Sequence, residues 1–278
     1  MKKKLELHGF YKYIISLCII LVVIGPLLVV LFTSFKTKEH MVTVSPLLLP
    51  PLNEITLENY REVFASRHLP VAIRNTVFIL AVSLLFNVIL GSVTAYILER
   101  FQFRFKRIVL SMFFLGMMVP SFVMEISRFK VIQSLGLYNT LGAPILIYVA
   151  ADLMQLYIYR QFIAQIPLEL EESALIDGCG YFRIFAQIIF PLLKPATATV
   201  LIIKTVNIIN DMYIPYLYMP KSEMKVLSTF LMSYASAQQG SWQTLSAAII
   251  VVVIPTVVLY VFFKKNIIEG ISAGAVKG

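Results

Sequence analysis

A series of apolar windows, each about as long as a membrane-spanning helix, constrains this chain more than any other feature. A helix needs about 20 predominantly apolar residues to cross the hydrocarbon core of a bilayer. Windows of this kind lie near 12–33, 71–98, 106–127, 141–163, 186–209 and 244–263. Only 14% of the 278 residues are charged, against roughly a quarter in soluble domains. The sequence therefore predicts an all-α integral membrane protein with six transmembrane helices in a single domain, residues 1–278.

The distribution of basic residues predicts which side of the membrane each loop faces. Of the 24 Lys and Arg residues, fourteen fall on one side of a six-span arrangement. They are Lys2, Lys3, Lys4, Lys12, Arg100, Arg104, Lys106, Arg107, Arg160, Arg183, Lys194, Lys264, Lys265 and Lys277. Because short cytoplasmic segments are enriched in Lys and Arg, this side is the predicted cytoplasm, and both termini are expected there. Membrane orientation thus accounts for the net charge of +9, and nucleic acid is not an expected partner.

A polar segment between the fourth and fifth windows carries unusually strong helix punctuation. Pro167 suits the first turn of a helix, and the acidic residues that follow it favour the positive end of the helix dipole. Gly178 and Gly180 can end such a helix and turn the chain. The pattern predicts one helix from about Pro167 to Asp177 and a second that begins near Tyr181. The apolar residues of the first helix do not form one stripe, so it is either held on several sides or part of an ordinary charged loop.

The same segment, residues 167–195, resembles the cytoplasmic signature loop of the permeases of binding-protein-dependent ABC importers, in particular the sugar importers of the maltose-transport type. The family has Glu-Ala-Ala where this chain has Glu172-Ser173-Ala174, keeps the glycine at Gly178, and has Leu-Pro at Phe190-Pro191. Ser173 and Phe190 are mild departures from that pattern. Two further segments add to the resemblance: they are Glu99–Phe103, which is similar to the family's second cytoplasmic loop, and the tail Ile271–Gly278.

This resemblance implies a function. The chain would be a permease subunit of an ATP-driven importer in a bacterial inner membrane, and it would translocate a sugar or oligosaccharide delivered by an external solute-binding protein. The loop helix would be a cytoplasmic coupling helix that docks on a separate ATPase subunit. The residues that carry the coupling would be Glu171, Glu172, Ser173, Ala174, Asp177 and Gly178. The resemblance also implies two ATPase copies, which bind ATP and Mg²⁺, and a second permease subunit, usually a different chain.

The motifs of nucleotide and metal chemistry are absent from the sequence. It has no GxxxxGK[ST] phosphate loop, so ATP hydrolysis is expected on a partner subunit. The three histidines form no HExxH or Cys/His pattern, and the two cysteines offer no CxxC site. No metal or cofactor is therefore expected on this chain, and we expect a non-catalytic membrane subunit.

Five polar or charged residues of the fourth and fifth windows are candidates for a translocation pathway. They are Asp152 and Gln155 in the fourth window, and Lys204, Asn207 and Asp211 in and just after the fifth. Spacings of three and four residues put each set on one helix face. A charge in hydrocarbon costs roughly 2.5–3.5 kcal/mol on insertion scales, so these faces should turn inward. In a structural interpretation Lys204 neutralises Asp152 or Asp211, and in a functional one the same faces line the pathway and bind a polyhydroxylated solute.

An ion-gradient-driven secondary transporter of a small polar solute is the main alternative function. Asp152, Lys204 and Asp211 would then be ion-coupling groups. Such transporters tend to contain inverted repeats, and the two halves of this sequence have no convincing similarity. A membrane scaffold without transport activity is a third class, for which replacing Gly178 or Glu172 would leave solute uptake intact.

Other patterns concern packing and the outer face. Small or polar residues recur every four positions in the second window, which predicts a closely packed helix face; they are Ser83, Asn87, Gly91 and Ala95. Pro120 is expected to bend the third span, and Glu125 and Arg128 are spaced to pair with each other. The long first outer loop, 34–70, is rich in proline. It is a passive connector by its loop character or, as the family resemblance implies, a contact for the solute-binding protein.

Overall fold

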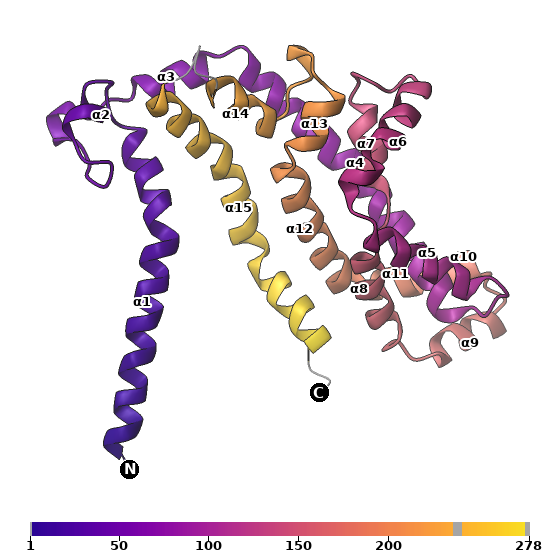
Figure 1. The fold of residues 1–278 in the computed structure, drawn as a ribbon. Coiled ribbons are helices and arrows are strands. Elements are labelled where there is room, and N and C mark those ends of the chain that lie inside the picture. The colour runs from indigo at the N-terminus through magenta and orange to yellow at the C-terminus, as the bar shows by residue number, and fades with distance from the viewer. Residues whose placement is uncertain (1, 236–240, 276–278) are drawn as a thin grey trace. The chain divides into compact units, whose positions relative to one another are not determined.

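The structure is a computed structural model that describes residues 2–235 and 241–275 (Figure 1). Within these ranges the chain is mostly helical and contains no β-strand, which confirms the all-α prediction. The longer helices are α1 (Lys2–Thr33), α4 (His68–Arg100), α5 (Lys106–Met118), α6 (Ser121–Ser134), α8 (Leu153–Ile163), α12 (Lys194–Asn210) and α15 (Trp242–Ala275). The shorter ones are α2 (His40–Thr43), α3 (Glu58–Ala65), α7 (Gly142–Val149), α9 (Glu169–Ile176), α10 (Tyr181–Ile184), α11 (Phe190–Leu192), α13 (Tyr213–Tyr218) and α14 (Leu227–Ala235).

In the described part of the chain, two helical segments are long and apolar enough to cross a membrane without interruption, Lys12–Thr33 of α1 and the whole of α4. Up to five spans result if each of three bent helix pairs counts as one, by length and composition alone. A shorter apolar helix, Trp242–Val258, lies in the sixth window. The count of six spans therefore stays a prediction. The end of the family-like tail, residues 276–278, lies outside the described residues.

Each of the three bent pairs overlaps one of the apolar windows. α5 and α6 meet at 108°, α7 and α8 at 45°, and Tyr181–Leu192 meets α12 at 75°. The first break falls at Val119, which is extended with ψ 119°. A residue before proline is restricted to such conformations, so Pro120 explains this break and the predicted bend is confirmed.

The chain forms two compact units, which we describe separately. One unit contains the residues up to Leu69 together with Thr229–Pro255, and the other contains Pro70–Ser228 together with the chain from Thr256. Whether the chain acts as one transmembrane domain stays a prediction.

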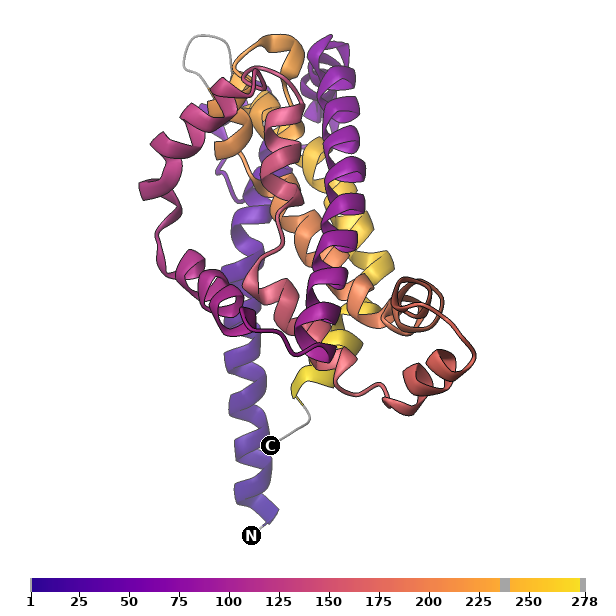
Figure 2. The same cartoon turned by 90° about the vertical axis from the view of Figure 1, so that its right-hand side faces the viewer.

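In the Pro70–Ser228 unit, α4 runs from a group of helices that includes α6, α7 and α13 to a second group that includes α5, α9 and α10 (Figures 1 and 2). Each group has its own apolar core. The core near α9 contains Tyr96, Leu98, Leu156, Tyr159, Ile163, Ile184, Ile189, Leu193 and Val200. The core near α13 contains Ile79, Ile132, Ala143, Ile208, Ile214, Tyr218 and Val226. α4 contributes to both, so it connects the two ends of this unit.

In the other unit, side-chain hydrogen bonds hold the segment 34–70, the first loop of the sequence prediction. Asn59 on α3 donates its side-chain amide to the carbonyls of Ser34 and Lys36, at 2.9 Å each. The ammonium of Lys36 donates to the carbonyl of Ser45 at 2.7 Å, and burial lowers the pKa of Lys36. Gln243 of α15 donates to the carbonyl of Thr37 at 3.1 Å. The proline-rich sequence favours turns and extended chain here, whereas the structure adds the short helix α3. Asn59 ties α3 to the end of α1, and Glu62 of α3 accepts the hydroxyl of Thr244 of α15 at 3.1 Å.

Candidate functional site

The predicted loop helix is present as α9, Glu169–Ile176, with three acidic residues in its first turn. The helix ends at Gly178, whose φ is +80°, a conformation that glycine adopts without steric cost. The N–H groups of Gly178 and Cys179 donate to carbonyls of the last turn at 3.0 and 2.9 Å, as in a common helix C-cap. Gly180 has an ordinary φ of −76°, and the second helix, α10, begins at Tyr181 as predicted.

The two faces of α9 are different. The side chains of Glu171 and Ala174 point inward and are buried, at 4% and 7% exposure. The other predicted coupling residues are exposed; they are Glu172, Ser173, Asp177 and Gly178. Apolar side chains extend this exposed face, because Ile176 and, on α10, Phe182 are 86% and 84% exposed. The six predicted residues therefore divide into four on an open face and two in the protein interior.

The buried carboxylate of Glu171 is bound by the C-terminal end of α4. Tyr96 donates its hydroxyl to Oε2 at 2.7 Å, and Arg100 donates Nε–H to Oε1 at 2.6 Å. The Nη2 group of Arg100 also donates to the carbonyl of Ile166 at 2.6 Å. We call Tyr96, Arg100 and Glu171 the α9 anchor. It satisfies both carboxylate oxygens, as a buried charge requires, and holds the chain before α9 as well as α9 itself.

Aromatic rings pack around the α9 anchor. The ring of Tyr96 lies 5.3 Å from that of Phe185 and 5.7 Å from that of Phe101, centroid to centroid. Phe101 in turn makes an edge-to-face contact with Tyr181 at 5.0 Å. Offset and edge-to-face geometries are the favoured ones for aromatic pairs. The segment after α9 therefore packs against the same end of α4 that binds α9.

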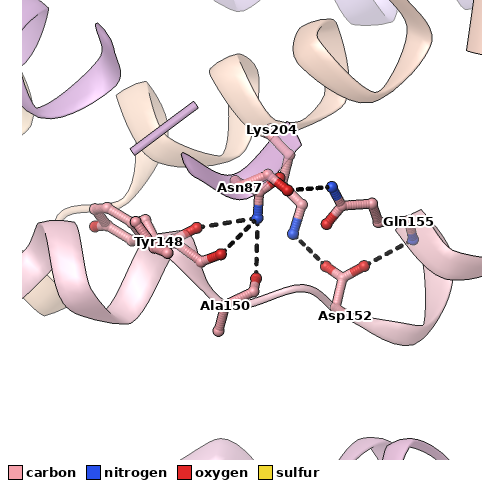
Figure 3. Close-up of polar contacts among 7 residues, drawn as sticks. Asn87, Tyr148, Ala150, Asp152, Gln155 and Lys204 are labelled. Carbon is pink, nitrogen blue, oxygen red and sulfur yellow. Dashed lines mark hydrogen bonds and ion pairs between the residues drawn. The ribbon is translucent and has the colours of Figure 1, made fainter. Parts of the chain in front are cut away.

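The break between α7 and α8 is held by polar side chains of α4. The amide nitrogen of Asn87 donates to the carbonyls of Tyr148, Val149 and Ala150, at 3.2, 3.3 and 3.0 Å (Figure 3). These carbonyls lie at the end of α7, where they have no helical N–H partner. On the other side of the break, Asp152 accepts the N–H of Gln155 at 2.8 Å and caps α8.

Gln155 brings α8 into direct contact with α4. Its side-chain amide donates to the carbonyl of Asn87 at 2.9 Å. This approach needs a glycine at position 91, because a Cβ there would lie 2.1 Å from Nε2 of Gln155. The four residues of the predicted packing face, Ser83, Asn87, Gly91 and Ala95, are all buried, so the packing interpretation is confirmed. The side-chain oxygens of Asn87 and Gln155 are buried without a hydrogen-bond partner.

Lys204 on α12 pairs with Asp152, at 2.5 Å between Nζ and Oδ2 (Figure 3). The side chain of Lys204 is 13% exposed and that of Asp152 is 52% exposed. Four of the five predicted pathway residues, Asp152, Gln155, Lys204 and Asn207, line one small cavity between α8 and α12. Of the two carboxylates left open by the sequence, the lysine therefore has Asp152 as its partner.

Asp211 lies apart from that cluster. Its carboxylate accepts the hydroxyl of Tyr148 at 3.0 Å and the N–H of Ile214 at 3.1 Å. Its carbonyl accepts the hydroxyl of Ser228 at 2.8 Å. These bonds cap α13 and tie it to α7 and α14, so the described contacts of Asp211 are structural.

A larger open cavity of about 760 Å³ adjoins the α7–α8 break. Its wall is mainly apolar and comes from α5 and from Ala150–Met154, with Asp152 and Arg128 as the charged members. Arg128 also pairs with Glu125 at 3.2 Å, which confirms the predicted local pair, and Glu125 accepts the hydroxyl of Tyr218 at 2.5 Å. The volume lies within the usual range for small-molecule sites.

Sequence reasoning did not identify Tyr96 and Arg100 as partners of the loop helix. Two features of the sequence could have indicated this contact. One is the charged pair Glu99 and Arg100 at the end of the second window, and the other is the glutamate-rich start of the loop 167–195. The spacing of about 70 residues between them gives no register by which to pair them. Among the described residues no group of three or more His, Cys, Asp and Glu side chains could hold a metal ion.

Comparison with known proteins gives the family context. A family model described as "Binding-protein-dependent transport system inner membrane component" matches residues 87–272. The multiple sugar-binding transport system permease protein MsmG of Streptococcus mutans is 34% identical over all of both chains. The probable starch degradation products transport system permease protein AmyC of Thermoanaerobacterium thermosulfurigenes is 30% identical over 99% of each.

A solved structure has the same fold. It is a bacterial ABC transporter involved in the import of the acidic polysaccharide alginate, and the match has a TM-score of 0.84. It covers 94% of this chain and 96% of that chain at 20% sequence identity. At this identity the likeness concerns the fold alone.

Proposed function

Because this chain belongs to the family of binding-protein-dependent transport system inner membrane components, we propose that it is the permease subunit of an ATP-driven sugar importer. It receives a sugar or oligosaccharide from an external solute-binding protein and passes it across a bacterial inner membrane. The permeases MsmG and AmyC, by their names, serve sugar and starch-product transport, and this similarity supports a carbohydrate as the solute.

The observation that carries the proposal is the asymmetry of α9. A short helix that is fixed to its own subunit on one face, and exposes Glu172, Ser173 and Ile176 on the other, is suited to dock on a partner. We assign the exposed face as the contact with an ATPase subunit. Hydrolysis then moves α9, and the attached helices rock to open the pathway alternately to each side.

The same proposal sets the assembly and its orientation. Two ATPase subunits bind ATP and Mg²⁺, and each needs one coupling helix, so a second permease subunit, usually a different chain, completes the complex. Six spans place both termini and the α9 loop in the cytoplasm. This chain supplies no catalytic residue and binds no cofactor of its own.

The pathway is assigned to the region beside the α7–α8 break. The cavity of about 760 Å³ next to it presents Asp152 and Arg128 among apolar groups, and the cluster of Gln155, Lys204 and Asn207 adjoins Asp152. Charged and amide groups of this kind hydrogen-bond hydroxyl groups of a sugar. The ion pair between Lys204 and Asp152 lowers the cost of both charges inside the membrane, so structural and pathway roles coexist here.

Uptake measurements test the proposal against the ion-gradient alternative. Membrane vesicles that contain the full complex and the solute-binding protein are given labelled oligosaccharides, with ATP supplied inside and ion gradients collapsed by ionophores. An ATP-driven importer continues uptake under these conditions. Uptake that stops with the gradient, or persists without ATP, identifies a secondary transporter instead.

A substitution at the C-cap of α9 tests the coupling role. Gly178→Asp adds bulk, charge and backbone strain to the exposed turn, and we expect loss of uptake with normal amounts of protein in the membrane. Gly136→Asp is the matched control, because Gly136 also has a positive φ, +69°, and also has no atom near its Cβ position. Normal uptake by the Gly178→Asp protein contradicts the coupling assignment.

A further inference from the structure

The α9 anchor has a geometry that goes beyond stabilising a loop. We propose that Tyr96, Arg100 and Glu171 form the mechanical link that joins α9 and α4 into one rigid body, and that Glu171 is a positioning residue rather than a contact for the ATPase subunit. This inference rests on the proposed function, since it states how motion of the docked helix enters the membrane region.

The first argument is the direction of the Glu171 side chain. Its carboxylate is 5% exposed, and each oxygen accepts a short hydrogen bond from α4. Charge-assisted hydrogen bonds of this kind are stronger than neutral ones. The neighbouring Glu172 points outward and is exposed. Two adjacent glutamates therefore have different tasks, one to hold α9 and one to face a partner.

The second argument is the position of the Arg100 side chain. The planar guanidinium donates in two directions, to Glu171 within α9 and to the Ile166 carbonyl before it. This geometry restrains α9 against sliding and against rotation, because two points of the chain on either side of Pro167 are bound to one rigid group. The ring contacts of Tyr96 with Phe185 add a third point, after α9.

The third argument is the continuity of α4. The third, fourth and fifth apolar windows are broken, whereas α4 is a single helix of 33 residues, about 50 Å long. A continuous helix transmits a displacement of one end to its other parts. Asn87, two and a half turns from Tyr96, holds the α7–α8 break, and Gln155 beside it contacts Asn87. The link therefore connects the docking loop to the candidate pathway along one helix.

Distance measurements between two spin labels test the rigid link. The labels are attached at Glu169→Cys on α9, outside the predicted docking residues, and at Val77→Cys on α4, in a chain with Cys18→Ser and Cys179→Ser. In the purified full complex we expect one narrow distance that is the same without nucleotide and after trapping with ATP and vanadate. In Arg100→Gln and Glu171→Gln we expect a distribution about twofold broader, because α9 loses its ion pair, and a shift upon trapping.

A second ion pair on α4 provides the matched control. Arg160 of α8 donates to Glu99 at 2.8 Å, one residue from Arg100, and its described contact with α4 does not involve α9. Arg160→Gln therefore removes a comparable pair, and we expect the label distance to stay narrow. Tyr96→Phe removes one hydrogen bond and keeps the ring, so it should broaden the distance distribution less than Arg100→Gln. It replaces the charge variants in the test if those fail to assemble.

Two outcomes overturn the link. One is a wild-type distance that shifts on vanadate trapping, since α9 then moves relative to α4. The other is an equally narrow distribution in Arg100→Gln, Glu171→Gln and Tyr96→Phe, since the anchor then holds nothing. If no ATPase subunit copurifies with the wild-type chain, the proposed function fails instead, and the nucleotide-free distributions still decide whether the anchor fixes α9.

Discussion

At the scale of single residues, the side chain of Gln155 determines what position 91 can hold. An alanine Cβ at 91 would lie 2.1 Å from Nε2 and 2.4 Å from Cδ of Gln155, so Gly91→Ala must displace Gln155 from the carbonyl of Asn87. Overpacking of this kind costs typically 1–3 kcal/mol. We expect a lower thermal unfolding temperature for the purified Gly91→Ala protein in detergent.

Gly116→Ala on α5 is the control for that change, because no atom lies within 4 Å of its Cβ position, and its stability should stay close to that of the original chain. Adding Gln155→Ala to Gly91→Ala removes the clashing side chain. The double variant should therefore lose less stability than the sum of its two single changes. Simple additivity would mean that Gln155 does not occupy the space beside Gly91.

Asp152 pairs with Lys204 and also caps α8, and substitutions can separate these two roles. Asn at 152 can still cap α8, so Asp152→Asn removes the charge and leaves the less exposed ammonium of Lys204 without its partner. Lys204→Met leaves a half-exposed carboxylate that borders the open cavity of about 760 Å³. We expect Asp152→Asn to destabilise more than Lys204→Met, with a coupling of about 1 kcal/mol in the double-mutant cycle. Unfolding of the four purified proteins measures it, and zero coupling would leave pathway lining as the role of both residues.

At the scale of elements, the length of α9 depends on the conformation of one residue. Gly178 has φ +80° and Gly180 does not have a positive φ, although neither has an atom within 4 Å of its Cβ position. A left-handed conformation costs an alanine roughly 1–2 kcal/mol, so Gly178→Ala should raise amide hydrogen exchange in α9 about tenfold. Gly180→Ala should leave exchange unchanged. Equal exchange in the two variants would contradict the role of Gly178 as the C-cap.

Local patterns in the sequence predict the elements well where the cause is itself local. The apolar windows follow from the hydropathy of consecutive residues. The bend at Pro120, the stop at Gly178 and the start at Tyr181 follow from backbone preferences of neighbouring residues. The family that the loop motif indicates is confirmed by the match over residues 87–272, whereas the coupling role of the loop stays a prediction. These parts of the fold needed no knowledge of long-range contacts.

The sequence does not predict parts whose cause is distant in the chain. The α7–α8 break depends on Asn87, about 60 residues earlier, and the burial of Glu171 depends on Arg100, about 70 residues earlier. The partner of Lys204 was left open between two carboxylates, because the helix faces alone do not give the rotation of α12 relative to α8. Pairing of this kind follows from tertiary packing, which the spacing of residues along a single sequence does not show.

At the scale of the whole molecule, the proposed function needs the first outer loop and the α9 loop on opposite sides of the membrane. Two positions of equal exposure make this testable, since Leu52 is 87% exposed and Ile176 is 86% exposed. Each is replaced by cysteine in a chain with Cys18→Ser and Cys179→Ser, so that a maleimide reports on that position alone. Equal exposure removes local burial as a reason for any difference in labelling.

With intact cells whose outer barrier is permeable to the reagent, a membrane-impermeant maleimide should label Leu52→Cys and leave Ile176→Cys unlabelled. In inside-out vesicles the two results should be reversed, because the positive-inside rule puts the basic segments around α9 in the cytoplasm. Labelling of both positions from the same side would mean that an even number of spans lies between residues 52 and 176, whereas the six-span prediction has an odd number. If both positions are labelled in intact cells, the α9 loop lies outside the cell, away from ATP, and cannot be a coupling helix.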